Sequence, residues 1–524
     1  MQNDGSREKL GILATHNFPA PSARTVQTVL CLAFLLAVGI FHLWFYGGYE
    51  NMPENHPTAG WEGWWDQSQY LRSARALAAG NLNPAEHWYP LGYPVLAAPF
   101  ARAGFQDPFL IPNLILVLAF AFAFLLFFRR YIGSGLSIAV FFATMLLPWI
   151  ISVPYEVRHI VWLQYVIPWN TIPVAAAYMF ILLLMRSLQG GDALWRHALL
   201  GALAGLVLVC RPADLIALLP VALFYGFQVV LRERRWRGAF AAVAGLMAVI
   251  GPIALLMLSI YGGLQTPYSE NIENIGLTPH YLLERAFAVG VDASMSWGLS
   301  DNSLLNVFPW LVVALPFAIL AAIRRPKEIG MLITVCACAF TTYVCFNDFS
   351  PLNIFRYFLI HYIVWMLPVL AAAGCVGVVA LVRSRSVHSS VLVGAGVAGM
   401  AVLSSFKAMP EPVWSRLENS VAPDGSRTST FVFDGPQRIN AVDIPGSNSN
   451  PEILYGNPYG VQFDSRPLRA LSEYREVRLA DRVRLVFNRP VTARTLSITL
   501  DDKTTATRAD GREAFPLRWR LRLN

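Results

Sequence analysis

Charged residues are scarce in this chain. Asp, Glu, Lys and Arg make up only 14% of its 524 residues, whereas apolar residues make up 55%. This balance excludes an ordinary soluble domain and is normal for a protein whose main solvent is lipid. A helix needs about 20 apolar residues to cross a bilayer, and runs of that length recur over roughly the first 400 positions. We predict about eleven transmembrane helices, near 27–47, 109–128, 134–153, 168–186, 194–211, 213–231, 238–261, 304–323, 329–346, 355–382 and 389–407.

Cysteine is also scarce, and its few residues fall in or at the ends of these spans: Cys31, Cys210, Cys336, Cys338, Cys345 and Cys375. None lies in the polar C-terminal part, so we predict no disulfide framework. In a helix, the spacing of Cys336 and Cys338 points their thiols to different faces, and no partner pair accompanies them. We therefore expect these cysteines to pack as small apolar residues and not to bind a metal.

The chain lacks nucleotide-binding signatures. Neither the GxxxxGK phosphate loop nor a GxGxxG run occurs, and the loops predicted to be cytoplasmic are too short to hold a nucleotide-binding domain. These absences disfavour a reaction that uses ATP or a nucleotide sugar from inside the cell. Nothing in the sequence indicates a nucleic-acid partner.

Basic residues lie at alternating ends of the predicted spans, in the segments Arg129–Arg130, Arg186–His197, Arg232–Arg237, Arg324–Lys327 and Arg383–Arg385. Short loops rich in Lys and Arg stay in the cytoplasm, so the N-terminal tail 1–26 is predicted inside and the C-terminal tail outside. Basic clusters flank both ends of 194–231, which requires an even number of crossings and makes Arg211-Pro212 an outer turn. The outer loops are then 48–108, 154–167, 262–303 and 347–354. No small-residue cleavage site follows the first span, so it resembles a retained signal anchor of a multi-pass inner (plasma) membrane protein.

The character of the chain changes near residue 408, where we place the end of the membrane domain 27–407. Residues 408–524 alternate short apolar segments with turn clusters, and in 515–523 the apolar side chains occupy every second position. We predict a small extracytoplasmic β-sandwich-like domain. Trp414, Tyr455 and Tyr459 could stack on carbohydrate, although a structural cap is the plainer interpretation.

The first outer loop holds the strongest functional signal. Asp66 stands at the start of a short amphipathic segment, and Gln69 follows three positions later, a spacing that suits a capping box. A carboxylate can cap a helix with one oxygen and act as a general base with the other. Asp66 is our catalytic candidate. Glu62, Glu156 and His56 are candidates for a second acid or for ligands of a divalent cation, and we expect Tyr70, His87, Tyr89 and Tyr93 to form a substrate loop.

Unpaired acids and bases outside the spans gather on the predicted outer side, including the loop 262–303. A reaction there needs an activated donor on that side, which a lipid phosphate can supply. Such a donor leaves a phosphate anion that cations near the membrane surface must stabilise. The candidates for this role are Arg356, Arg211, Arg158, His159 and Arg285. The alternative is that each of them snorkels to lipid headgroups as an interfacial anchor.

Across its membrane part, the chain resembles the GT-C superfamily of membrane glycosyltransferases. The resemblance is carried by the acid-led first outer loop, the segment Tyr89-Pro-Leu-Gly-Tyr-Pro94, Arg211-Pro212 and Arg356-Tyr357. The layout is similar to the protein mannosyltransferase and aminoarabinose transferase branches, which take a sugar from a polyprenyl phosphate. The resemblance implies that Asp66 is the catalytic acid and that Arg356 binds the donor phosphate. Gln67 stands where the protein mannosyltransferases carry a second acid, which argues against their version of the site.

The sequence thus predicts an all-α, GT-C-like membrane glycosyltransferase. It would transfer a sugar, with inversion, from a polyprenyl-phosphate donor to a glycan, lipid or protein acceptor on the outer face. A transporter or flippase for lipid-linked sugars is one alternative, but it needs polar, broken helices near the bilayer midplane. An oligosaccharide ligase of the same fold is another.

Overall fold

The structure is a computed structural model. It describes residues 23–49, 65–150, 160–188, 193–269, 277, 279, 282–291, 303–346, 349, 359–384, 388, 391, 393–399, 416–421, 423, 427–445, 462–463, 474–478, 482–501, 506–507, 513–514 and 518–523.

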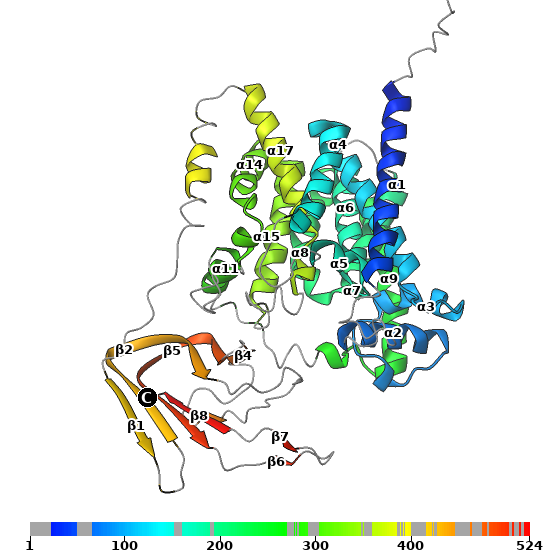
Figure 1. Cartoon of the computed structure of the whole chain (residues 1–524). Helices are drawn as coiled ribbons and strands as arrows, with labels where there is room; N and C mark the ends of the chain where they lie inside the picture. The colour runs from blue at the N-terminus through cyan, green and yellow to red at the C-terminus, as the bar shows by residue number, and fades with distance from the viewer. Residues whose placement is uncertain are drawn as a thin grey trace, which may run out of the picture.

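Helices make up the first three quarters of the chain (Figure 1). The α-helices are α1 (Ala23–Tyr49), α2 (Trp65–Ala78), α3 (Gly92–Arg102), α4 (Leu110–Ile150), α5 (Ile160–Val166), α6 (Thr171–Ser187), α7 (Leu194–Cys210), α8 (Leu215–Tyr225), α9 (Trp236–Tyr261), α11 (Leu282–Gly290), α13 (Leu304–Val307), α14 (Leu311–Arg324), α15 (Met331–Val344) and α17 (Met366–Ser384). Short 3₁₀ turns are η3 (Pro84–Glu86), η6 (Pro212–Asp214) and η10 (Leu359–Tyr362), and π-helical segments are η7 (Gly226–Arg232) and η9 (Pro326–Gly330).

By length and composition, 6 helical stretches within the described residues could cross a membrane, and α6, α7 and α14 are shorter apolar helices. The chain is therefore a multi-pass membrane protein. Each predicted span up to 355–382 overlaps at least one of the described helices. Of the last predicted span, 389–407, the structure describes only 391 and 393–399, so the total of eleven stays a prediction. Within the predicted outer loop 154–167, residues 160–166 form the buried helix α5, and the bounds of the loop stay a prediction.

The element α4 is two helices that double back on each other. Gly133, at φ 79° and ψ 163°, breaks the helix in a region that glycine enters without steric cost. In one straight helix, Phe120 and Phe141 would lie about 30 Å apart. Their ring centroids are instead 5.9 Å apart, and those of Phe124 and Phe141 are 5.3 Å apart. The predicted separate spans 109–128 and 134–153 are therefore an antiparallel pair joined at Gly133.

Two helix pairs approach so closely that only glycine fits between them. A Cβ atom on Gly245 of α9 would lie 1.9 Å from the carbonyl oxygen of Ala198 in α7. A Cβ on Gly377 of α17 would lie 1.9 Å from the carbonyl oxygen of Phe317 in α14. Small residues at such crossings let backbones pack in van der Waals contact, the usual source of helix association in lipid.

Basic side chains at helix ends bind carbonyl groups of neighbouring helix ends. The contacts are Arg186 Nη1 to Phe127 O (3.0 Å), Arg235 Nη1 to Leu188 O (3.1 Å) and Arg324 Nη1 to Ala380 O (2.9 Å). The loops that carry the predicted cytoplasmic charge thus pack against the ends of neighbouring helices. Which side of the membrane they face stays a prediction.

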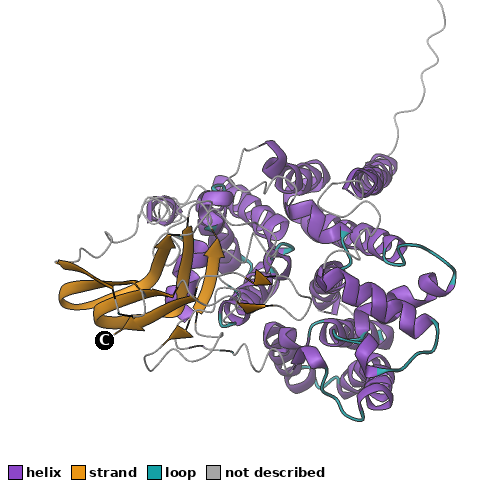
Figure 2. Ribbon diagram, turned by 60° about the horizontal axis from the view of Figure 1, so that its bottom comes forward, coloured by secondary structure: helices purple, strands orange, loops and turns teal. Residues whose placement is uncertain are grey.

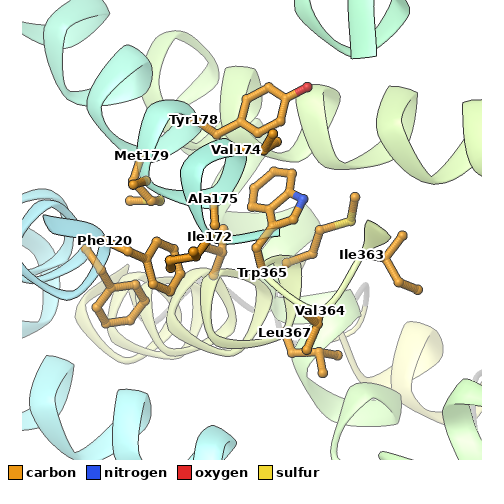
Figure 3. Packing of buried hydrophobic residues seen from close by; sticks show 14 of the residues in the cluster. Phe120, Ile172, Val174, Ala175, Tyr178, Met179, Ile363, Val364, Trp365 and Leu367 are labelled. Carbon is orange, nitrogen blue, oxygen red and sulfur yellow. The ribbon is translucent and has the colours of Figure 1, made fainter. Parts of the chain in front are cut away.

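The buried core fixes the segment just before α17 against α6. The indole ring of Trp365 is fully buried beside Val174 and Ala175, and it stacks on Tyr178 with a centroid separation of 4.8 Å (Figure 3). This contact holds η10, which carries His361 and Tyr362, over the N-terminal end of α6. The described cysteines are all free thiols within the helical part, as expected.

The strands lie below the helices in the view of Figure 1 and are orange in Figure 2. They are β1 (Arg416–Val421), β2 (Arg427–Pro445), β3 (Gln462–Phe463), β4 (Tyr474–Arg478), β5 (Arg482–Asp501), β6 (Ala506–Thr507), β7 (Glu513–Ala514) and β8 (Arg518–Leu523). A 6-stranded sheet has the order β1-β2-β5-β8-β3, with β4 also paired to β5, and β6 and β7 form a separate pair. Neighbours are antiparallel except β3 and β8.

The pairing of β5 with β8 follows the alternation in the sequence. Leu521 and Leu523 lie opposite Ile498 and Leu496, whereas the intervening arginine, Arg522, lies opposite a serine. The apolar positions of the two strands are therefore in register with each other. The two-layer sandwich and the boundary at 408 stay predictions, and Trp414, Tyr455 and Tyr459 lie outside the described residues.

Candidate active site

Asp66 lies in the first turn of α2, and its partner is a side chain from further along the segment between α1 and α4. Tyr89 donates its hydroxyl proton to Asp66 Oδ1 over 2.5 Å. Because α2 begins at Trp65, Asp66 is inside the helix and not at its N-cap, so the capping-box interpretation is wrong. A carboxylate in the first turn still gains from the helix dipole. The position of the acid is thus fixed by a tertiary contact as well as by the helix.

Partial burial changes the acidity of Asp66. Loss of solvation raises the pKa of its carboxyl group, and the hydrogen bond from Tyr89 lowers it in part. Burial also raises the pKa of Tyr89 well above its usual range, so the phenol stays protonated and remains the donor. A carboxylate with a raised pKa is a better proton acceptor than an exposed one, as a general base requires.

Tyr89 belongs to a group of five aromatic side chains, which we call the tyrosine cluster: Tyr70, Tyr89, Tyr268, Tyr343 and Tyr362. Tyr89 stacks on Tyr70 with centroids 4.6 Å apart and lies 4.7 Å from Tyr268. The hydroxyl groups of Tyr268 and Tyr362 are 2.9 Å apart. Tyr362 in turn stacks on Tyr343 at 4.2 Å. The cluster therefore connects the first outer loop with the segments that follow α9 and precede α17.

Arg211 contacts the tyrosine cluster through the ring of Tyr362. It follows the last residue of α7 in an extended conformation and is only 3% exposed. Its guanidinium carbon lies 5.1 Å from the centre of the Tyr362 ring. Its nitrogens donate to Asn170 Oδ1 (2.7 Å), His361 O (3.0 Å), Thr171 Oγ1 (3.2 Å) and Tyr362 O (3.4 Å). Most of the five N–H donors of this arginine are thus engaged with the protein itself.

Asn170 links Arg211 to Tyr70, which in turn contacts Tyr89, the partner of Asp66. We call the Asp66 end of this chain of contacts the acid side of the site and the Arg211 end the cation side. Its amide nitrogen donates to the hydroxyl oxygen of Tyr70 (3.1 Å) and to the carbonyl oxygen of Cys210 (3.0 Å), while its amide oxygen accepts from Arg211. Tyr70 stacks on Tyr89, which binds Asp66. The candidate acid and the buried cation are therefore joined by two routes, one through Tyr70 and one through Tyr268 and Tyr362.

Asp214, in η6, is a buried acid that the sequence analysis overlooked. It is 1% exposed and accepts the hydroxyl hydrogen of Tyr343, and its backbone N–H binds Arg211 O. The available signal was an acid three residues after an arginine at the start of an apolar span. An ionisable side chain at such a place has a structural or functional partner, because an isolated charge there is costly.

His87 and Tyr93 of the predicted substrate loop are buried and hydrogen bonded within the protein. His87 Nε2 lies 3.0 Å from Asn81 O and Nδ1 lies 2.8 Å from Ser73 Oγ, so the ring bridges α2 and its own loop. Burial lowers the pKa of His87, which favours the neutral ring. Tyr93 donates to Asn113 Oδ1 over 2.7 Å and is fully buried. Both side chains hold the loop in place.

Arg285 is also placed by the structure, in α11. Its Nη1 donates to Cys345 O over 3.1 Å, at the C-terminal end of α15 and two residues beyond Tyr343. This bond ties α11 to the C-terminal end of α15, and a role of Arg285 in phosphate binding stays a prediction.

The remaining predicted site residues lie outside the described residues: Arg356, Arg158, His159, Glu62, Glu156 and His56. Within the described ranges, no group of three or more His, Cys, Asp or Glu side chains is arranged to hold a metal ion. The predicted second acid and divalent cation are therefore untested.

Comparison with protein-family models gives no match to this chain, and a search of the curated proteins gives none either. Among solved structures, the chain is similar to ArnT from Cupriavidus metallidurans bound to undecaprenyl phosphate, with a TM-score of 0.43 and 18% identity. The match covers 72% of this chain, which spans 64% of the ArnT chain. A likeness of this degree assigns neither a family nor an activity.

Proposed function

We propose that this protein is a membrane glycosyltransferase that moves one sugar from a polyprenyl-phosphate donor to an acceptor hydroxyl on the outer face of the membrane. The observation that supports this most directly is the position of Asp66. Its partly buried carboxylate lies in the segment between α1 and α4, held by Tyr89, and the tyrosine cluster links it to the buried cation Arg211. The GT-C-like order of motifs in the sequence supplies the reaction class.

The reaction follows from these groups. Asp66 accepts the proton of the acceptor hydroxyl on its carboxylate, while Tyr89 keeps the other oxygen oriented. The hydroxyl oxygen forms a bond to the anomeric carbon as the bond from that carbon to the phosphate oxygen breaks. Both electrons of the broken bond leave with the polyprenyl phosphate, and attack from the opposite face inverts the anomeric centre.

The departing phosphate needs positive charge near the membrane surface. We assign direct contact with it to Arg356, on the strength of the sequence motif. Arg211 is placed differently, because its donors bind Asn170, Thr171 and backbone carbonyls. Its proposed part is to organise the wall of the site.

The test is Asp66→Asn. The Asn side-chain oxygen still accepts a hydrogen bond from Tyr89, so the fold should survive, whereas the basic carboxylate is gone. Turnover should fall by about 10²- to 10⁴-fold, the usual contribution of a general base. Activity is measured with purified protein and a panel of synthetic polyprenyl-phosphate monosaccharides, scored for transfer to a mixture of envelope glycolipids and for hydrolysis.

Asp107→Asn is the matched control. Asp107 lies in the same outer loop and accepts the backbone N–H of Phe109, which Asn also does. Turnover by the Asp107 variant should stay near that of the unmodified protein. Near-normal turnover by Asp66→Asn would remove Asp66 from the chemistry. If the unmodified protein moved labelled lipid across vesicles without breaking the sugar–phosphate bond, it would be a transporter instead.

A further inference from the structure

Tyr268 connects the acid side and the cation side of the site through side-chain contacts of its own, with Tyr89 and with Tyr362, on the route that does not pass through Tyr70. It lies after α9, in the outer loop 262–303, and is partly buried. Its ring lies 4.7 Å from that of Tyr89, and its hydroxyl lies 2.9 Å from that of Tyr362. Its backbone N–H also donates to Trp88 O over 3.2 Å.

The contacts on either side of Tyr268 are fixed by other bonds. Tyr89 holds Asp66, and its neighbour Trp88 is tied to Tyr268 through the backbone. Tyr362 is sandwiched by Arg211 at 5.1 Å and Tyr343 at 4.2 Å. Two described hydrogen bonds join these halves: the hydroxyl pair of Tyr268 and Tyr362, and the bond from Asn170 to the hydroxyl of Tyr70.

We propose that the hydroxyl pair of Tyr268 and Tyr362 sets the distance between Asp66 and the cation-bearing wall of the site. Tyr268 is then a positioning residue that acts through Tyr89 and Tyr362, and this role rests on the proposed transferase function. Three segments far apart in sequence meet here: the loop before α3, the helical residues 267–269 after α9, and the 3₁₀ turn η10. A rigid link between such segments matters, because a misplacement of about 1 Å at reacting groups can cost about 100-fold in rate.

The direct variants are Tyr268→Phe and Tyr362→Phe. Each keeps the aromatic ring and its stacking but removes one hydroxyl of the pair. Each should lower kcat by about 10-fold, because the reacting groups are less well aligned in the transition state. KM for the donor should change by less than about 2-fold, because binding of the donor is not altered. The donor is the member of the synthetic polyprenyl-phosphate monosaccharide panel that turns over fastest.

The double variant gives the decisive measurement. If the two hydroxyls act as one bond, removing both should cost no more than removing one, so the effects on kcat are not additive. Multiplication of the two single effects would show that each hydroxyl acts alone, and the proposal would be overturned. Unchanged kcat in both single variants would overturn it as well.

Tyr261→Phe is the matched control. Tyr261, at the end of α9, donates to His87 O over 2.8 Å and so joins the same two segments of chain through a similar bond. Its loss should lower thermal stability as much as Tyr268→Phe does while leaving kcat near normal. An equal fall in kcat would show that general loosening of the loop explains the effect, which contradicts the proposal.

Two outcomes separate this proposal from the proposed function. If Asp66→Asn keeps its activity, the transferase mechanism fails first. If Asp66→Asn is inactive but the tyrosine variants are normal, the mechanism stands and the positioning role of Tyr268 fails.

Discussion

The hydrogen bond between Tyr89 and Asp66 makes a quantitative prediction about the pH dependence of activity. Tyr89→Phe removes the donor but keeps the ring that stacks on Tyr70. Burial raises the pKa of Asp66 and the Tyr89 bond partly offsets it, so the variant should leave the burial effect unopposed. The pKa of Asp66 should therefore rise further.

The size of the shift follows from the bond. A hydrogen bond to a charged acceptor is worth about 1.5–3 kcal/mol, and one to a neutral acceptor about 1 kcal/mol. The difference favours the ionised carboxylate by about 0.5–2 kcal/mol in the unmodified protein, and about 1.4 kcal/mol corresponds to one pKa unit. The acid limb of the pH–rate profile should then move up by about one pH unit in Tyr89→Phe.

The sign of the effect can be checked directly. A general base works in its ionised form, so activity falls as the pH drops through its pKa. With a higher pKa, the variant loses activity at a less acidic pH and recovers it when the pH is raised. The measurement is kcat/KM against pH with a synthetic polyprenyl-phosphate monosaccharide, over the range in which the protein stays folded.

Tyr93→Phe serves as the control for this experiment. Its hydroxyl binds Asn113 and not Asp66, so the position of the acid limb should not change even if stability does. An acid limb that stays in place in Tyr89→Phe, or that moves to lower pH, would mean that Asp66 is not the titrating base.

Three further predictions concern packing, charge and the tail. Gly245→Leu should prevent close packing of α7 and α9 and lower the free energy of unfolding by about 3 kcal/mol or more, which is measured as loss of monodisperse protein in detergent. Gly251→Ala is the control in the same helix and should be tolerated, because nothing lies within 4 Å of the added Cβ atom. Arg211→Ala should lower the free energy of unfolding by about 3–5 kcal/mol, because it strands buried acceptors and a buried acid, while Arg211→Lys should recover part of it in thermal unfolding. Truncation after Ser405 should leave a membrane-inserted protein that still hydrolyses a short-chain donor slowly, as measured by release of free sugar. If a truncated protein that is folded and binds donor releases no sugar, a catalytic residue lies in the tail.

Local pattern was enough to predict the helical part of the chain. Apolar runs of the right length, bounded by basic residues, predicted spans that overlap the described helices. The break near Gly133 was also predicted, because Arg129 and Arg130 interrupt the apolar sequence there. Both signals are local along the chain, and a helix in lipid satisfies its backbone within itself.

The surroundings of the candidate site could not be predicted in the same way. The sequence suggested a capping box around Asp66 because Gln69 follows at the right spacing, but Asp66 already lies within the helix and Tyr89 binds the acid. Helix ends are uncertain by one or two residues in any local analysis. Contacts between Asp66 and Tyr89, or Tyr268 and Tyr362, join residues far apart in sequence, which no local spacing encodes.

The burial of Arg211 bears on which cation can stabilise the departing phosphate. Asp214 lies three residues later, equally buried, so the outer turn carries one cation and one anion close together. A lone charge at this depth would cost several kcal/mol, and the pair offsets much of that cost. The same compensation weakens the field that Arg211 can apply to a departing phosphate. A phosphate dianion therefore needs a cation that is not already balanced, and the motif around Arg356 is where the sequence provides one. In the proposed mechanism, Arg211 and Asp214 therefore build the wall of the site, and Arg356 binds the phosphate.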